Sequence, residues 1–275
     1  MTNPQENLIA IENVTHAYRK DGHALPVLEN LNLGVPQHGF TAVVGPSGCG
    51  KSTLTRLIAG LMRPDEGSVW LHGEQVVSPR STVGMAFQNP VLLEWRSILK
   101  NVLLPLEIVP TSLSKQDAED RARHLLHLVG LSAFEAKRPS ELSRGMRQRA
   151  SLCRALIHNP DVLILDEPFG ALDAFTREDL WLTMHKLRAE EPFTGVLITH
   201  DLRESIFLAD EVVVLSDRPA TVQHSVSLKR EGVPSLDQLY TSDSIATLNG
   251  LNEAVSDSQL CDGYLPDLLG GPRLG

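Results

Sequence analysis

A glycine-rich run with one lysine and several hydroxyls carries the clearest chemistry in the sequence. It consists of Gly45, Pro46, Ser47, Gly48, Cys49, Gly50, Lys51, Ser52 and Thr53. The run matches the pattern G-x-x-x-x-G-K-[ST], in which the glycines let successive backbone N–H groups turn toward an anion. Lys51 would reach the β- and γ-phosphates of a nucleotide, and the Ser52 hydroxyl would ligate Mg²⁺. We therefore predict a phosphate loop that binds a nucleoside triphosphate.

Two adjacent carboxylates form the next group of candidate catalytic residues. Asp166 and Glu167 follow the apolar residues 162–165. In a chain with a phosphate loop, Asp166 would hold Mg²⁺ directly or through water. Glu167 would accept a proton from the attacking water as a general base. A solvated Asp-Glu pair at a strand end is the alternative, and the four apolar residues before the pair argue against it.

Three single residues could complete the site. His200 closes the apolar residues 195–199, where an imidazole can donate a hydrogen bond to a phosphate oxygen or hold the general base in place. Gln88 follows residues 83–87, and its amide could contact Mg²⁺ or the attacking water. Tyr18 lies upstream of the phosphate loop and could stack on an adenine base. Taken singly, each of the three has a structural alternative, such as packing in the core or filling the surface.

Apolar runs rich in β-branched residues predict the strands that must present these groups. We predict strands at residues 8–18, 40–44, 83–87, 162–165, 195–199 and 211–215. A polar turn is expected over residues 18–22. Residues 92–158 look mainly helical, and residues 112–117 open one of these helices. Strands separated by helices indicate an α/β sheet that binds its ligands at the carboxyl ends of the strands.

The phosphate loop should lead directly into a helix. Apolar residues recur at helical spacing after the loop, so we expect a helix that begins at about Lys51. These apolar residues are Leu54, Leu57, Ile58 and Leu61. The strand before the loop and the helix after it argue against the alternative of a chance glycine-rich turn.

The composition changes near the end of the chain. From Glu231 to Gly275, Ser, Asp, Gly and Pro dominate and the strand pattern stops. One weak amphipathic helix, capped near Ser242, is possible there. Its apolar face would hold Ile245, Leu248, Leu251 and Val255. A loosely attached or disordered acidic tail is the alternative. We therefore divide the chain into a domain over residues 1–230 and a tail over residues 231–275.

The overall composition limits the classes of protein that the chain can belong to. Its 275 residues suffice for one large domain or two small ones, and 42% apolar with 21% charged residues is ordinary for a globular protein. A net charge of −9 argues against a nucleic acid as the main partner. Residues 1–7 lack a basic and then apolar leader, and no apolar run is long enough to span a bilayer. A membrane role would therefore require docking onto another subunit.

Three widely spaced cysteines, Cys49, Cys153 and Cys261, suggest reduced thiols in a cytosolic compartment. Since Cys49 lies within the phosphate loop, we expect its thiol to be modifiable without nucleotide and shielded when ATP is bound. Cys153 is expected to be an inert core residue.

Together, the motifs resemble the ATP-binding cassette (ABC) ATPase family. The resemblance spans about residues 8–220 and rests on Tyr18, the phosphate loop, Gln88, residues 142–149, Asp166 with Glu167, residues 171–173, and His200. It implies an α/β P-loop NTPase with a RecA-like core, an antiparallel β subdomain and an α-helical subdomain inserted at about residues 90–158. It also implies adenine stacking by Tyr18, a lid loop at Gln88, a signature at residues 142–146 and a D-loop that ends at Asp173.

The resemblance further implies a head-to-tail dimer in which each ATP lies between the phosphate loop of one copy and the signature of the other. Ser143 and Gly145 open a helix, so their N–H groups would form a second anion site for the partner's γ-phosphate. ATP would then hold the dimer together and hydrolysis would loosen it. The usual Leu-Ser-Gly-Gly-Gln signature is altered here, with Arg144 at the first glycine and Met146 at the glutamine. We expect the Arg144 side chain to point away from the nucleotide.

Residues 88–97 look like the transmission loop of bacterial importers in the nitrate, sulfonate and taurine group, and residues 168–174 and 215–219 resemble the same group. An apolar patch of Leu92, Leu93 and Trp95 suits a groove that receives a cytoplasmic helix of a permease. Packing of these residues into the protein's own helical subdomain is the alternative.

For an importer of this kind, the resemblance implies an ATPase that uses ATP and Mg²⁺ at the cytoplasmic face of the inner membrane, as a peripheral subunit. It would energise the uptake of a small solute such as nitrate, a sulfonate or taurine. Its partners would be a second copy of the chain, transmembrane permease subunits and, indirectly, a periplasmic or extracellular solute-binding protein. The sequence does not specify the solute, the permease or the role of residues 231–275.

Two other functions fit the sequence less well. A cytosolic ABC ATPase that acts on nucleic acid or ribosomes usually carries two cassettes, a long coiled-coil insertion or zinc-binding cysteines, and none of these is found here. The net acidity of the chain also counts against it. A nucleotide-binding regulatory module without turnover is disfavoured by the presence of both Glu167 and His200.

Overall fold

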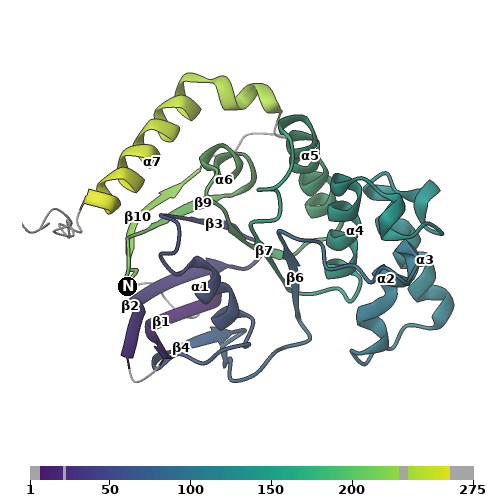
Figure 1. The fold of residues 1–275 in the computed structure, drawn as a ribbon, viewed down its shortest axis with the longest axis horizontal. Coiled ribbons are helices and arrows are strands. Elements are labelled where there is room, and N and C mark those ends of the chain that lie inside the picture. Colours follow the sequence, from purple (N-terminus) through teal and green to yellow (C-terminus); the bar gives the residue numbers. More distant parts are fainter. Residues whose placement is uncertain (1–6, 21–22, 229–234, 261–275) are drawn as a thin grey trace, which may run out of the picture.

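A six-stranded sheet forms the centre of the molecule, for which a computed structural model describes residues 7–20, 23–228 and 235–260 (Figure 1). The strand order is β10-β9-β3-β8-β7-β6, with every neighbouring pair parallel except β10 with β9. The strands are β3 (Phe40–Val44), β6 (Val83–Phe87), β7 (Val162–Asp166), β8 (Thr194–Ile198), β9 (Glu211–Leu215) and β10 (Val222–Ser227). The inner strands are continuous apolar runs because both faces of the sheet are covered.

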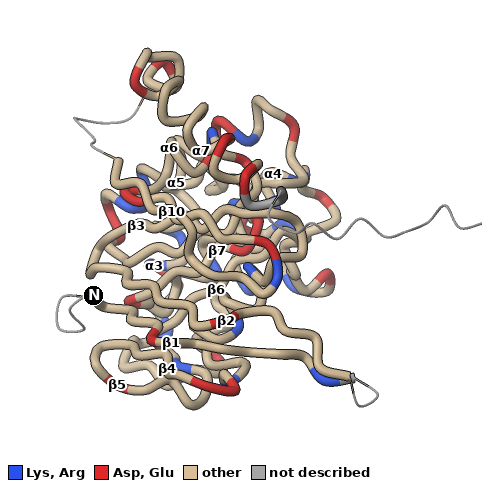
Figure 2. Tube along the Cα trace, turned by 90° about the vertical axis from the view of Figure 1, so that its left-hand side faces the viewer, with Lys and Arg blue, Asp and Glu red and all other residues tan. Residues whose placement is uncertain are grey.

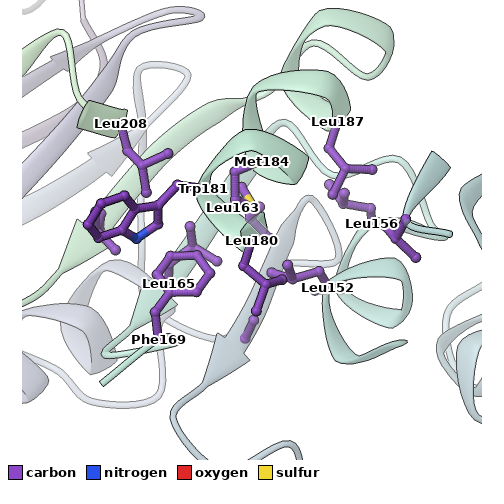
Figure 3. Packing of buried hydrophobic residues seen from close by; sticks show 14 of the residues in the cluster. Leu152, Leu156, Leu163, Leu165, Phe169, Leu180, Trp181, Met184, Leu187 and Leu208 are labelled. Atoms are coloured by element: carbon purple, nitrogen blue, oxygen red, sulfur yellow. The ribbon is translucent and has the colours of Figure 1, made fainter. Parts of the chain in front are cut away.

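The two faces of this sheet pack against two different cores. In β7, Val162 and Ile164 join the core beneath the antiparallel sheet, whereas Leu163 and Leu165 join the core beneath the helices. This alternation follows from the two-residue period of a strand. On the helical side, Trp181 and Leu180 of α5 (Ala174–Glu190) pack among these strand residues, as Figure 3 shows.

The antiparallel sheet has the order β2-β1-β4-β5. Its strands are β1 (Asn7–Lys20), β2 (His23–Pro36), β4 (Glu66–Leu71) and β5 (Glu74–Gln75). The helix α1 (Lys51–Ile58) contributes Leu54, Leu57 and Ile58 to the core that this sheet shares with the central sheet.

The helical part of the molecule lies beyond the β6 edge of the central sheet (Figure 1). It contains α2 (Ile98–Leu103), α3 (Lys115–Leu128) and α4 (Arg144–Leu156), with 3₁₀ helices at Leu104–Glu107, Ser132–Phe134 and Pro139–Glu141. The predicted opening of a helix within residues 112–117 is confirmed, because the Ser114 hydroxyl caps α3 by accepting from the Asp117 N–H.

The last described helix lies on the opposite side of the molecule from the helical part. After α6 (Leu202–Leu208) and a 3₁₀ helix at Leu236–Tyr240, helix α7 (Ser242–Leu260) runs along the outer edge of the fold (Figure 1). The predicted helix is confirmed, and Leu239 and Leu251 are buried in the larger core, so residues 235–260 are not a loosely attached tail. The expected boundary at Glu231, and Cys261, lie outside the described residues. Among the helices of the described ranges, none is both long and apolar enough to cross a membrane.

Two local predictions are wrong. Leu61 lies beyond α1 and is exposed, because Gly60 adopts a left-handed conformation with φ of 71° and ends the helix. Tyr18 does not open a turn either, since β1 continues to Lys20 and pairs Tyr18 with Leu25 of β2. The rest of that expected turn lies outside the described residues.

Candidate functional site

The phosphate-loop residues 45–53 join the buried end of β3 to the start of α1, at the carboxyl edge of the central sheet. Gly48 and Gly50 have φ of 80° and 125°, which other residues rarely adopt. A Cβ on Gly50 would also lie 2.8 Å from Cγ1 of Val27. The loop conformation therefore requires glycine at these two positions.

The Lys51 ammonium is held inside the loop. Its Nζ donates to the carbonyl oxygens of Gly45, at 2.8 Å, and Pro46, at 2.7 Å. The side chain is buried, so its positive charge is poorly screened by water and would act strongly on an anion held by the curled loop.

Ser52 and Asp166 meet across the sheet edge, with 3.4 Å between Oγ and Oδ1. Burial raises the pKa of Asp166, and the neighbouring Glu167 carboxylate raises it further. A hydroxyl and a carboxylate are oxygen donors of the kind that Mg²⁺ accepts, and a cation there would offset the cost of burying the carboxylate. The described residues contain no cluster of three or more His, Cys, Asp or Glu that could hold a metal ion. Two oxygen donors of this kind would suit an Mg²⁺ ion whose remaining ligands are substrate phosphates and water.

The structure brings Glu167 and His200 together from the ends of neighbouring strands. Oε1 of Glu167 lies 3.6 Å from Nδ1 of His200. Glu167 has φ of 49°, a strained value for a residue other than glycine, and its N–H donates to the Ile198 carbonyl at 2.9 Å. The bond to β8 holds the strained backbone in place, and the carboxylate faces the phosphate-loop cleft.

This cleft has a volume of about 280 Å³ and extends from Tyr18 to Glu167. It is lined by Tyr18, Leu25, Val27, Ser47, Gly48, Gly50, Lys51, Ser52, Thr53, Glu167 and Arg218. Sequence reasoning missed Leu25 and Val27, because β2 was not predicted. It also missed the place of Arg218 in the cleft: residues 215–219 were noted only for their resemblance to the importer group, and Arg218 lies in the turn after β9.

Tyr18 lies at one end of the cleft with its hydroxyl fixed. The hydroxyl is 3.2 Å from Oγ1 of Thr53 and accepts from the Arg56 guanidinium at 3.4 Å. The ring contacts His16 edge-on at 5.3 Å between centroids and remains partly exposed. An aromatic ring held in this way can offer its free face to a flat base.

Ser143 and Gly145 form a separate site at the start of α4. The Ser143 hydroxyl accepts from the Met146 N–H at 3.3 Å. A Cβ on Gly145 would lie 2.4 Å from Cγ2 of Thr176, so α5 begins in contact with α4. Asp173 caps α5 by accepting from the Thr176 N–H and hydroxyl, and these bonds lower the pKa of Asp173. None of these residues lines the phosphate-loop cleft.

Gln88 and Arg144 lie at the junction of β6 with the helical part. The Gln88 and His200 side chains both lie close to Gly170. A Cβ added to Gly170 would be 3.3 Å from Nε2 of Gln88 and 3.4 Å from Cε1 of His200. Gln88 thus approaches the Glu167 loop without lining the cleft. Arg144 donates to Oδ1 of Asn89 at 3.3 Å. This bond draws the Arg144 guanidinium toward β6.

The expectation of one exposed patch over Leu92, Leu93 and Trp95 is wrong for Leu92. Only 7% of Leu92 is exposed and it belongs to the main core, whereas Trp95 is 73% exposed. The reason is Asn101, a buried residue whose side chain bonds to the backbone of Leu93, Arg96 and Ser97. These bonds draw one side of the loop inward and leave Val91 and Trp95 outside.

The structure argues against the expected reactivity of Cys49. The Cys49 side chain is fully buried, and burial raises its pKa against the opposing effect of Lys51. Cys153 is fully buried as well, and burial also raises its pKa.

We therefore predict that an aromatic disulfide reagent modifies Cys49 at least about tenfold more slowly in the folded protein than in guanidinium, with or without ATP. A Cys261→Ser variant removes the third thiol from the measurement, and the absorbance of the released thiolate reports the rate. Rapid labelling that ATP suppresses would contradict the buried position of Cys49.

Comparisons with known proteins agree with this geometry. The family model described as ABC transporter matches residues 28–170. The nitrate import ATP-binding protein of Synechococcus elongatus is 44% identical over 193 residues, which cover 70% of each chain. The taurine import ATP-binding protein of Pseudomonas syringae pv. tomato is 42% identical over 224 residues, 80% of this chain and 83% of that protein. A solved dimeric ATP-binding cassette in a post-hydrolysis state, bound to ADP and Pi, has a TM-score of 0.71 at 29% identity and covers 81% of this chain and 100% of that one.

Proposed function

The chain belongs to the ABC transporter family, and we propose that it is the ATP-hydrolysing subunit of an importer for a small anionic solute. The observation that carries this proposal is the meeting of Glu167, His200 and the phosphate loop at one sheet edge. A purely nucleotide-binding module would not need a carboxylate and an imidazole placed together beside the phosphates.

The predicted site residues in and beside the cleft each have a chemical role in this proposal. The loop N–H groups and Lys51 bind the triphosphate and neutralise its charge. Glu167 accepts the proton of the attacking water, and His200 orients Glu167 and contacts the γ-phosphate. Mg²⁺, held by Ser52 and Asp166 with Gln88 nearby, would neutralise charge on the phosphate oxygens. Tyr18 stacks on the adenine.

The second anion site supports a two-copy arrangement. Ser143 and Gly145 open α4 away from the chain's own phosphate-loop cleft, so their N–H groups would contact a nucleotide bound to a second copy. The similar solved cassette is described as a dimer. The bond from Arg144 to Asn89 supports the expectation that the arginine leaves this site open. In the proposed dimer, Asp173 lies near the contact between the copies.

The proposed solute and location follow from the relatives. Two of them are named for the import of nitrate and taurine, which are small molecules with an anionic group. The chain would work at the cytoplasmic face of the membrane, with the permease bound near residues 88–97 and a solute-binding protein outside. Nucleic acid is a poor alternative partner, because the net charge is −9 and Figure 2 shows basic positions interspersed with acidic ones.

The permease contact predicts the effect of one substitution. Trp95→Asp should lower co-purification with the cognate permease by at least about tenfold, because the exposed aromatic side chain that the permease would cover is replaced by a charge. Hydrolysis by the isolated subunit should stay within about twofold, since Trp95 does not line the cleft. The matched control is Val77→Asp, which changes an exposed apolar residue in the loop after β5. Undiminished co-purification of Trp95→Asp would exclude this docking surface.

The function itself is tested by ATP-driven uptake in membrane vesicles that hold the chain and its permease. The experiment would compare the uptake of nitrate, taurine, an alkanesulfonate and, as a cationic control, choline. Uptake of nitrate, taurine or the alkanesulfonate that stops when ATP is omitted is the expected result. Hydrolysis without transport of any of these three solutes would overturn the importer assignment.

A further inference from the structure

The His200 ring depends on its backbone for its position. It lies between the end of β8 and the start of α6, and 57% of its side chain is exposed. Packing therefore holds the ring only weakly, and its approach to Glu167 is set by whatever fixes the neighbouring residues Thr199 and Asp201.

One arginine fixes this segment from the side of α5. Arg177 donates through one guanidinium nitrogen to Oδ2 of Asp201 at 2.8 Å, and through another to the Leu172 carbonyl at 3.0 Å. It thus joins the residue after His200 to the residue before Asp173. The rigid planar fork of arginine suits such a bridge, because both bonds come from one group.

A buried carboxyl group fixes the segment from the side of α6. The Asp201 N–H donates to Oγ1 of Thr199 at 3.0 Å, and the Thr199 hydroxyl donates to Oε2 of Glu204 at 3.2 Å. Glu204 is only 1% exposed. Burial raises the pKa of Glu204 well above its ordinary value.

We propose that Arg177 is a positioning residue for His200: it links the position of residues 171–173 to that of the imidazole. Glu204 supports the same segment through Thr199. The inference rests on the proposed function, in which His200 contacts the γ-phosphate. Residues 171–173 adjoin the second anion site through the contact between Asp173 and Thr176. Binding of a second copy at that site would therefore change the position of His200 through the Arg177 guanidinium.

The test compares two arginines of the same helix. Arg177→Gln removes the bridge, and Arg188→Gln is the matched control. Arg188 is similarly exposed (23% against 27%) and also joins an aspartate, Asp210, to a backbone carbonyl. Its partners lie outside the His200 segment.

Arg177→Gln should lower kcat for ATP hydrolysis by about tenfold or more, with less than about a twofold change in KM, because a displaced catalytic group costs rate rather than ground-state binding. Arg188→Gln should leave kcat within about twofold, whatever its effect on thermal stability. An equal kcat for the two variants would overturn the proposal.

A double-mutant cycle separates positioning from a general structural effect. In a His200→Ala background, Arg177→Gln should cost no further activity, because the residue acts only through the imidazole. If Arg177→Gln lowered kcat by the same factor in the His200→Ala background as in the wild-type protein, the proposal would be overturned. For Glu204, the Gln variant should retain activity, since its amide oxygen can accept from Thr199, and the Leu variant should lose it.

A spectroscopic measurement keeps the inference testable apart from hydrolysis. The NMR signal of the His200 ring, assigned by its absence from His200→Ala, should shift in nucleotide-free Arg177→Gln and stay in place in Arg188→Gln. An unshifted signal would overturn the inference even if the chain is an ATPase. A wild-type chain without hydrolysis would instead overturn the proposed function, and the NMR result would still decide the role of Arg177.

Discussion

Replacing Glu167 with Gln should lower the rate of ATP hydrolysis by at least about a hundredfold, because the amide keeps the size of the carboxylate but cannot accept a proton. The carboxylate is the group that the strained backbone of Glu167 and the bond from its N–H to the Ile198 carbonyl aim at the cleft. ATP affinity should change by less than about threefold, since the loop and Lys51 supply most of the binding. Phosphate release and equilibrium binding of an ATP analogue would measure the two quantities.

The control for this substitution is Glu29→Gln, which changes an exposed glutamate of β2. It should leave both hydrolysis and ATP binding within about twofold of the wild-type values. If Glu167→Gln hydrolysed ATP as fast as Glu29→Gln, another group would have to accept the proton.

Replacing Lys51 with Ala should weaken ATP binding by at least about a hundredfold, the second large effect that the structure predicts. The substitution removes a buried positive charge and leaves the carbonyls of Gly45 and Pro46 without their donor. The loop should then lose both its charge and its shape. Titration with a fluorescent ATP analogue measures the affinity.

Lys115→Ala is the control for the Lys51 variant, because Lys115 is an exposed lysine at the start of α3. It removes the same charge from the protein without touching the loop, and its affinity for ATP should stay within about twofold. ATP binding by Lys51→Ala that matched the control would show that the phosphates bind elsewhere.

Four of the six strands that sequence reasoning found, β3, β7, β8 and β9, are almost entirely buried. The predictions at residues 40–44 and 211–215 match β3 and β9 residue for residue, because a strand covered on both sides is a continuous apolar run. The prediction at residues 83–87 also matches β6, an edge strand whose burial alternates but whose residues are still apolar. The missed strands β2, β4, β5 and β10 each expose many of their residues. The pairing of β1 with β2 also shifts register several times, which breaks the alternation that a pattern search needs.

The family expected from the order of the motifs is confirmed. Parts of the site, however, depend on contacts between residues that are far apart in the sequence, and no motif predicts such contacts. The phosphate loop is contiguous, so its local conformation could be predicted. The meeting of Glu167 with His200 requires β7 and β8 to be neighbours, with Asp166 opposite Ile198. Arg177 and Glu204 become visible only when α5 and α6 are placed beside the His200 segment.

The most direct test of the account is the mass of the Glu167→Gln protein in solution, because the central claim is that two copies enclose two ATP molecules. Light scattering should give 30.2 kDa without nucleotide and twice that mass with saturating Mg-ATP. The same variant carrying Ser143→Arg, which fills the second anion site, should stay at the lower mass. A Glu167→Gln protein that remained a single copy with Mg-ATP, both alone and with its permease, would contradict the account.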